Sequence, residues 1–296
     1  MPEIIESSVF ATIPDSLRAS VADPRSGSAR RNSLEGPSFD RDGNLWCVDT
    51  RLGRLHRISP AGHWEMALEY DGAPNGLKFH QDGRAFIADR RRGLVVFDPA
   101  SGKVETLVGG PAPGESFKGL NDLVFHSTGD VCFTDQGRTG LQDPSGRVFR
   151  YSPATGKLDC LIANAPSPNG LVFDRRETAL FVAVTRANAI WRIATADPTE
   201  QLRTGLFVQL PSAGPDGLAL DEDGNLAVAH PTAGVVRLYS RYAEELAIVK
   251  TCKGRGTANI AYGGEDNRNI YITEQESSCI LVARMPKPGK RMFSHL

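Results

Sequence analysis

The chain has 296 residues, of which 40% are hydrophobic, so it can bury a substantial core and is not globally disordered. Its 34 basic residues nearly balance its 35 acidic ones, which disfavours a protein built mainly to hold nucleic acid. No apolar run approaches the ~18 residues that span a bilayer, and the opening MPEIIESSVF is not typical of a secretory signal. We therefore expect neither a nucleic acid nor a membrane as a partner.

The cysteines give no sign of a disulfide framework or a zinc site. They are odd in number and scattered, with no C-x-x-C pair: Cys47, Cys132, Cys160, Cys252 and Cys279. Reduced, mostly buried thiols in a cytoplasmic protein are the expectation.

One sequence phrase recurs six times along the chain. Each copy starts with a polar residue, continues as an alternating strand, and turns tightly at a pair such as Asp42-Gly43 or Asp82-Gly83 into a second strand. The leading residues are spaced 40, 46, 48, 47 and 43 apart. They are Glu35, Asn75, Asn121, Asn169, Asp216 and Asn259.

The segments between the phrases predict two more strands for each repeat. Third strands are expected at 53–59, 93–99, 146–152, 189–193, 234–240 and 279–284. Fourth strands are expected at 63–68, 103–108, 157–162, 205–210 and 245–250. Four antiparallel strands in each of six repeats indicate an all-β, six-bladed β-propeller.

The propeller is expected to form a single domain over residues 1–296, with the repeats filling 35–296. The sixth repeat has only a weak fourth strand. Within the leading segment 1–34, Ser8–Ile13 is predicted to supply that strand and close the ring, because closure removes an exposed sheet edge.

The six leading residues are predicted to form a ring around the channel, because the first strand of each blade lies nearest the axis. All six are carboxylates or carboxamides, although Asn and Asp are depleted from strands. Turn formation would explain Asn75, Asn169 and Asp216, each followed by Gly, but explains the other three poorly. Oxygen ligands without histidine favour Ca²⁺, Mg²⁺ or Mn²⁺ over Zn²⁺.

The second strands end on the same face as the ring. Polar residues there are expected to orient the ring side chains: Asp49, Asp89, Asp135, His230 and Glu274. His230 is also a candidate for substrate binding, with a hydrogen-bonded structural histidine as the alternative. The loops 109–119 and 136–146 open on this face, where Arg138 is either a clamp for substrate oxygens or a solvated side chain.

Four segments resemble one family when taken in order: EGP at Glu35, ND at Asn121, SPNGL at 167–171 and PDGLALD at 215–221. They are similar to the senescence-marker-protein (regucalcin), gluconolactonase and luciferin-regenerating-enzyme family. The resemblance implies one catalytic divalent cation in the channel, held by Glu35, Asn169 and Asp216. Calcium is the preferred candidate for this cation. The resemblance also implies that Asp216 is the general base and that Asn121 contacts the substrate or the cation. Asn75 joins Asn121, Arg138 and His230 as a substrate-binding candidate.

The predicted function is hydrolysis of a lactone, and a sugar-acid lactone is the preferred substrate class. No G-x-S-x-G elbow, H-E-x-x-H helix or phosphate-binding glycine loop is present, so a cation is the economical source of chemistry. The cation would polarise the carbonyl, and either Asp216 or a metal-bound hydroxide would serve the attacking water.

Three alternatives stay open at this point. Sugar lactonases of the regucalcin type often carry Arg two residues before the Asn of the ND pair, where this chain has Gly119, and this favours a less polar lactone or another ester. A non-catalytic, metal-containing binding propeller and a calcium-handling role are the others. The substrate is expected to be a small molecule, and the sequence leaves the oligomeric state open.

Overall fold

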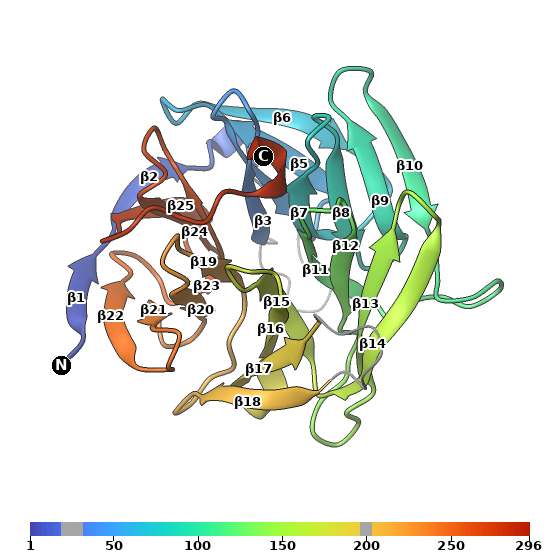
Figure 1. Cartoon of the computed structure of the whole chain (residues 1–296). Helices are drawn as coiled ribbons and strands as arrows, with labels where there is room; N and C mark the ends of the chain where they lie inside the picture. Colours follow the sequence, from blue (N-terminus) through green and yellow to red (C-terminus); the bar gives the residue numbers. More distant parts are fainter. Residues whose placement is uncertain (19–31, 196–202) are drawn as a thin grey trace.

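The computed structural model describes residues 1–18, 32–195 and 203–296, and the part of the predicted leading segment at 19–31 lies outside them. Six sheets stand around a central axis (Figure 1). The first three blades are β3 (Leu34–Phe39), β4 (Leu45–Asp49), β5 (Arg54–Ile58) and β6 (Trp64–Glu69); β7 (Pro74–Phe79), β8 (Ala85–Asp89), β9 (Gly93–Asp98) and β10 (Lys103–Val108); and β11 (Leu120–Phe125), β12 (Val131–Asp135), β13 (Gly146–Ser152) and β14 (Lys157–Ala165).

The last three blades repeat this order. They are β15 (Pro168–Phe173), β16 (Ala179–Val184), β17 (Ala189–Ala194) and β18 (Thr204–Gln209); β19 (Leu218–Leu220), β20 (Leu226–His230), β21 (Val235–Tyr239) and β22 (Glu245–Lys250); and β23 (Thr257–Gly263), β24 (Asn269–Glu274) and β25 (Cys279–Arg284). The first strand of each blade contacts the first strand of the next, and β23 returns to β3. The predicted six-bladed propeller is confirmed.

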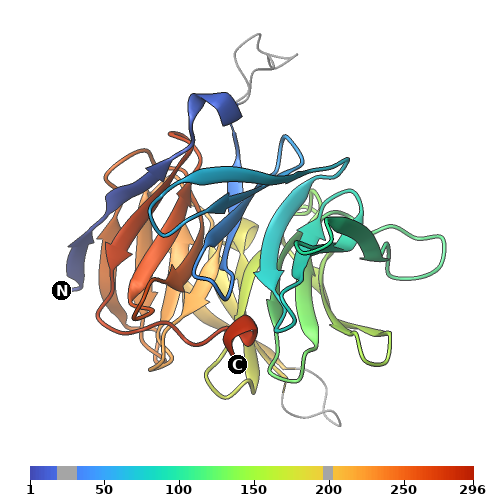
Figure 2. The ribbon, with the colours of Figure 1, turned by 90° about the horizontal axis from the view of Figure 1, so that it is seen from above.

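The amino terminus closes the ring as predicted. Strand β2 (Ser8–Thr12) pairs antiparallel with β25, with Ser8 opposite Val282 and Thr12 opposite Cys279, and gives the sixth blade its fourth strand. Strand β1 (Glu3–Glu6) goes further and pairs parallel with β22 of the fifth blade, which the sequence did not predict. Figure 2 shows both strands beside the last two blades.

Burial falls from the axis outwards, as expected for blades packed face to face. All five residues of β8 are buried, whereas the side chains of β10, at the outer edge of the same blade, are all exposed or half-buried. Between the first two blades the rings of Trp46 and Phe79 meet edge to face, with centroids 5.4 Å apart and an interplanar angle of 71°, and Leu77 is fully buried beside them. Each such buried side chain contributes about 1.5–3 kcal/mol to stability.

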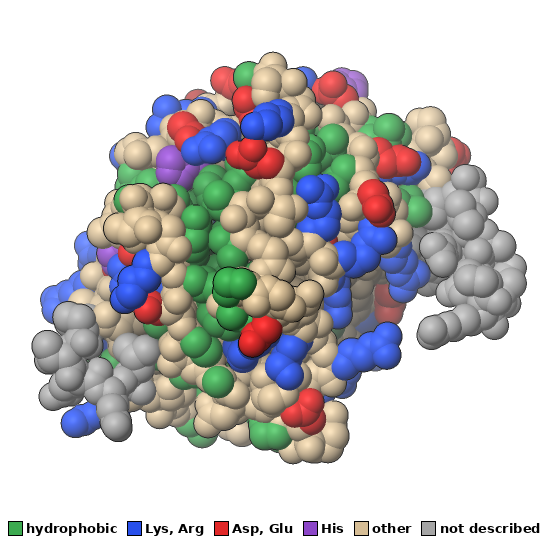
Figure 3. All heavy atoms as spheres, turned by 90° about the vertical axis from the view of Figure 1, so that its right-hand side faces the viewer, with side chains coloured by type: hydrophobic (Ala, Val, Ile, Leu, Met, Phe, Trp, Pro, Cys, Tyr) green, Lys and Arg blue, Asp and Glu red, His purple; other side chains and the backbone are tan. Residues whose placement is uncertain are grey.

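The outer surface carries charges of both signs. On the side where β10 and β14 lie, Lys and Arg side chains are interspersed with Asp and Glu around a stripe of hydrophobic ones (Figure 3). None of the helices among the described residues has the length and apolar character needed to cross a membrane. All five cysteines are free, with Cys47, Cys132 and Cys279 buried.

Candidate active site in the channel

A break in strand pairing frees the leading residues to face the channel. In β3, β7, β11, β15 and β23 the ladder to the second strand shifts register at or next to the leading residue, for example between Leu120 and Leu123 and between Pro168 and Leu171. A bulge of this kind re-aims a side chain that a regular ladder would hold in alternation. In the fifth blade, Asp216 stands just before β19.

The glycines after these residues serve close packing rather than turns. A β-carbon added to Gly170 would lie 2.4 Å from the carbonyl oxygen of Asp216 in the next blade, and one added to Gly217 would lie 2.1 Å from Asn259 Oδ1. Neither contact is sterically possible, so only glycine lets neighbouring inner strands approach this closely. Close packing between blades, and not turn formation, therefore explains the glycines of the Asn-Gly and Asp-Gly pairs at these positions.

Asp122 joins the predicted ring, although the sequence did not single it out. Its side chain is 2% exposed, and Asn259 Nδ2 donates to its Oδ2 across 3.1 Å from a strand 137 residues away. Strict alternation would turn Asp122 away from the face that Asn121 occupies, and the bulge in β11 removes that restriction. Aligning the six repeats would have revealed Asp122, because the third copy has Asp where four other copies have Gly.

Three carboxyl groups therefore influence one another inside the channel. Burial raises the pKa of Glu35, and repulsion from Asp216 and Asp122 raises it further. Burial followed by repulsion from Asp122 raises the pKa of Asp216 to about 8, while a hydrogen bond from Asn169 opposes the rise. Burial also raises the pKa of Asp122, against the attraction of Lys78. Lys78 is 7% exposed, and its Nζ donates to Pro37 O at 3.2 Å.

Three ring side chains each use one end for a hydrogen bond and leave an oxygen free. Gln275 Nε2 donates to Glu35 Oε1 at 3.0 Å, Asn121 Nδ2 donates to Gln136 Oε1 at 2.9 Å, and Asn169 Nδ2 donates to Thr185 Oγ1 at 3.1 Å. The opposite atoms are buried and have no hydrogen-bond partner among the described residues: Glu35 Oε2, Asn121 Oδ1 and Asn169 Oδ1. Buried oxygens in proteins are nearly always satisfied, so each of these three requires a partner, either a water molecule, a substrate donor or a cation.

The remaining candidates take different places. Asn75 belongs to the ring, where its Nδ2 donates to the Asn121 carbonyl at 3.1 Å. His230 is fully buried, with Nε2 against the carbonyls of Ser212 and Ala213 and Nδ1 accepting from Arg237 at 3.1 Å. Burial lowers the pKa of His230. Arg138 is exposed on the 136–146 loop, and that loop meets the 109–119 loop where Gly137 N donates to Gly119 O at 3.1 Å.

The acidic residues that end the second strands hold loops instead of ring side chains, which corrects the expectation for them. Asp89, for example, accepts the backbone N–H groups of Ala73, Arg91 and Arg92 at 2.8 Å each. Glu274 likewise accepts from Gly256 N at 3.0 Å and Ser277 N at 2.7 Å. The side chains that contact the ring come one position after the second strand: Gln136, Thr185 and Gln275.

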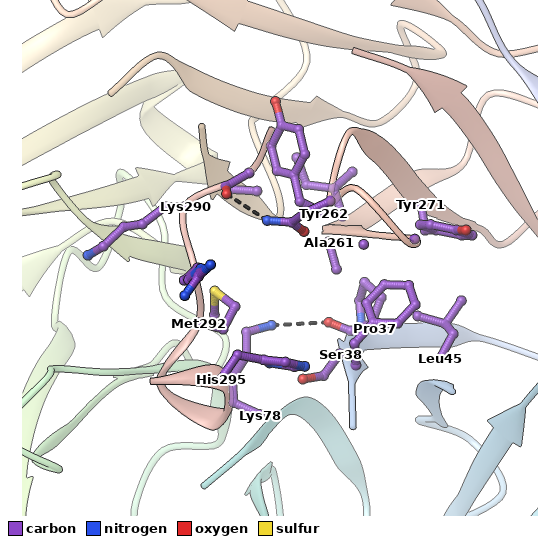
Figure 4. A pocket seen from close by; sticks show the side chains of 18 of the residues that line it. Pro37, Ser38, Leu45, Lys78, Ala261, Tyr262, Tyr271, Lys290, Met292 and His295 are labelled. Carbon is purple, nitrogen blue, oxygen red and sulfur yellow. Dashed lines mark hydrogen bonds between the residues drawn. The ribbon is translucent and has the colours of Figure 1, made fainter. Parts of the chain in front are cut away.

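A cavity of about 1000 Å³ lies at the other ends of the inner strands, away from the ring. Figure 4 shows Lys78 reaching Pro37 there, close to Met292 and His295 of the carboxy-terminal segment. That segment crosses this end of the channel, where Lys290 N donates to Leu220 O at 2.8 Å and Phe293 stacks on Phe125. None of the predicted site residues lines this cavity, so the polar ring and its loops define the candidate active site.

Comparison with known proteins adds to this geometry. Residues 34–276 match the family described as SMP-30/Gluconolactonase/LRE-like region. A gluconolactonase of Zymomonas mobilis is 29% identical over 274 residues, covering 81% of this chain and 75% of that protein. The lactonase drp35 of Staphylococcus aureus is 28% identical over 222 residues, covering 70% of this chain and 66% of that protein.

Solved structures share the fold. The calcium-binding protein regucalcin from Agrobacterium tumefaciens superposes with a TM-score of 0.77 at 20% identity, covering 100% of this chain and 99% of its own. A gluconolactonase from Xanthomonas campestris gives 0.76 at 22% identity, covering 94% and 95%. At these identities the likeness concerns the architecture alone.

Proposed function

The chain belongs to the SMP-30/Gluconolactonase/LRE-like family, and from this premise we propose that it is a divalent-cation-dependent hydrolase that opens lactones. Relatives named gluconolactonase and lactonase support the reaction class. The observation that carries the proposal is the set of three buried ring oxygens that have no hydrogen-bond partner in the part of the chain that the structure describes, together with the carboxyl group of Asp216.

These residues fit a hard divalent cation in both chemistry and charge. Glu35, Asn169 and Asp216 would hold it, and all three offer oxygen, which Ca²⁺ and Mg²⁺ prefer. Three ionised carboxylates with the Lys78 ammonium leave two net negative charges, the number that one divalent cation neutralises. A bound cation of this kind supplies polarisation of a carbonyl and stabilises the charge that develops on its oxygen.

The chain's own residues would manage the proton and the substrate. As a water oxygen adds to the lactone carbonyl carbon, Asp216 accepts the proton that the water loses. When the ring C–O bond breaks, the same proton passes to the departing alkoxide, and a hydroxy acid is released. Asn121 would accept a hydrogen bond from the substrate through Oδ1, because its Nδ2 is held by Gln136.

The loops 109–119 and 136–146 at the opening of the channel favour a second substrate class beside sugar-acid lactones. Gly119 has φ +138°, a conformation that disfavours any residue with a side chain, so the 109–119 loop presents no guanidinium here. Lys118, next to it, donates to Ser145 Oγ at 3.0 Å on the facing loop. The lack of an arginine side chain at position 119 favours a less hydroxylated lactone as the second candidate.

Acid release from a lactone panel tests the proposal. Metal-free protein would be assayed on D-glucono-δ-lactone and on aliphatic γ- and δ-lactones, with Ca²⁺, Mg²⁺, Mn²⁺ or Zn²⁺ added back. Turnover is expected only with a cation and is expected to disappear in Asp216→Asn, whose folding is checked by circular dichroism. A wild-type protein that binds a cation and hydrolyses none of the panel would refute the lactonase and favour a binding propeller.

A further inference from the structure

Thr185 stands between two of the proposed cation ligands. It begins the short 3-10 turn η2 (Thr185–Ala187), directly after β16. Its hydroxyl oxygen lies 3.1 Å from Asn169 Nδ2 and 2.8 Å from the carbonyl oxygen of Pro215, the residue before Asp216. One hydroxyl therefore joins the side chain of Asn169 to the segment that carries Asp216.

The chemistry of these groups fixes the direction of both hydrogen bonds. A carbonyl can only accept, so the single hydroxyl proton of Thr185 goes to Pro215 O. Only lone pairs then remain for Asn169, which must present its NH₂ group to Thr185; the same NH₂ group also donates to Asp216, and the Oδ1 is left as the free end of the carboxamide. Among the residues that the structure describes, that Oδ1 is buried and has no hydrogen-bond partner. A flipped carboxamide would present N–H groups, which cannot bind a cation.

We propose that Thr185 is a positioning residue that sets the polarity of the Asn169 carboxamide and thereby the cation affinity of the channel. The inference rests on the proposed function, because it assumes that the ring holds a cation. In another blade Gln275 holds Glu35 through a different arrangement, in which its NH₂ group donates to Leu34 O and Glu35 Oε1, but a carboxyl group has oxygen at both ends and needs no such choice of polarity. Groups that orient metal ligands typically change metal affinity by about 10- to 100-fold when removed.

Calcium titration of the metal-free protein by calorimetry tests the inference without relying on activity. Thr185→Val keeps the shape of the side chain but frees the carboxamide to turn, so we expect affinity to fall about 10- to 100-fold. Thr185→Ser restores the hydroxyl and should return the affinity to within about threefold of wild type. Thr178→Val is the matched control, because the Thr178 hydroxyl bonds Asp174 Oδ2 at 3.1 Å at the far end of the same blade. It should leave calcium affinity unchanged.

A double-mutant cycle separates orientation from general packing. In Asn169→Asp the side chain has oxygen at both ends, so its orientation no longer matters. In this background Thr185→Val should lower the calcium affinity little, or even raise it, because in Asn169→Asp the lone pairs of Thr185 face a carboxylate. A merely structural role would give the same loss of affinity in both backgrounds.

The outcomes distinguish this inference from the proposed function. If the wild type binds none of Ca²⁺, Mg²⁺, Mn²⁺ and Zn²⁺, the cation site itself is refuted. If the wild type binds and Thr185→Val binds equally well, or loses as much in the Asn169→Asp background, the positioning role is overturned. If Thr185→Val does not fold, Thr185→Ala replaces it under the same expectations.

Discussion

Replacing Asp216 with asparagine should stabilise the cation-free protein. Burial and repulsion from Asp122 raise the pKa of Asp216 from 3.8 to about 8, so its proton is held more tightly in the folded chain than in the unfolded one. For such an acid, ionisation opposes folding. The penalty is absent below the unfolded pKa near 4, grows as the pH rises, and levels off above about 8.

The size of the effect follows from that interval. Between 3.8 and pH 7 lie about three pH units, and at 1.36 kcal/mol for each the penalty reaches about 4 kcal/mol. The asparagine NH₂ group needs an acceptor of its own, and an unsatisfied buried group costs about 1–3 kcal/mol. We therefore expect a net gain in the free energy of unfolding of about 1–3 kcal/mol at pH 7, falling towards zero or below at pH 5.

Denaturant unfolding of metal-free wild type and Asp216→Asn, followed by circular dichroism from pH 5 to pH 8, measures this gain. Asp42→Asn is the control, because Asp42 is exposed in the Asp-Gly turn at the rim and asparagine preserves that turn. A stability difference that does not grow with pH would refute the reasoning. Saturating calcium should reverse the order, since a cation that binds only the folded wild type stabilises it.

Three further predictions follow from the same contacts. Calcium binding near pH 7 should release at least one proton, because the pKa of Asp216 and that of Glu35 are both raised and both groups must ionise to bind the cation, and calorimetry in two buffers of different ionisation enthalpy measures it. Lys78→Met removes the cation that attracts Asp122 and so leaves the channel with more net negative charge. We expect calcium to bind about tenfold more tightly, or by about 1.4 kcal/mol, and the metal-free protein to be less stable at pH 8. An unchanged calcium affinity would contradict the count of two net negative charges in the channel. Removing residues 1–13 leaves β25 as an open sheet edge. We expect the unfolding temperature to fall and aggregation, measured by light scattering, to increase. A truncated protein that stays monomeric and equally stable would show that β2 is dispensable.

The sequence determined most of the fold because the repeats report the same pattern six times. Predicted strands at 103–108 and 245–250 coincide with β10 and β22, since alternation and turn residues mark both ends locally. Strand β1 escaped prediction for a physical reason. Its partner β22 lies some 240 residues away, and no local turn fixes a parallel pairing of Glu3 with Ala247.

The candidate site was predictable only where repeat position decides side-chain direction. The ring follows from equivalence among six copies, whereas Asp122 depends on a bulge whose register is set by the neighbouring strand. The orienting side chains were expected one residue too early. The acidic residues at the strand ends look suited to that task, yet backbone N–H groups of the adjoining loops already occupy them, as at Asp89.

Ring closure and the site meet at the seam between the last blade and the first. Gln275, which follows β24 in the last blade, holds Glu35 in the first blade, and β2 seals the outer edge of that last blade. The carboxylates of Glu35, Asp122 and Asp216 repel one another across the channel and so favour separation of the blades that carry them. The closing strand opposes that separation by pairing, and a cation opposes it by charge. The amino terminus, although far from the channel in sequence and at the outer edge of its blade, therefore contributes to holding the ring of oxygens together.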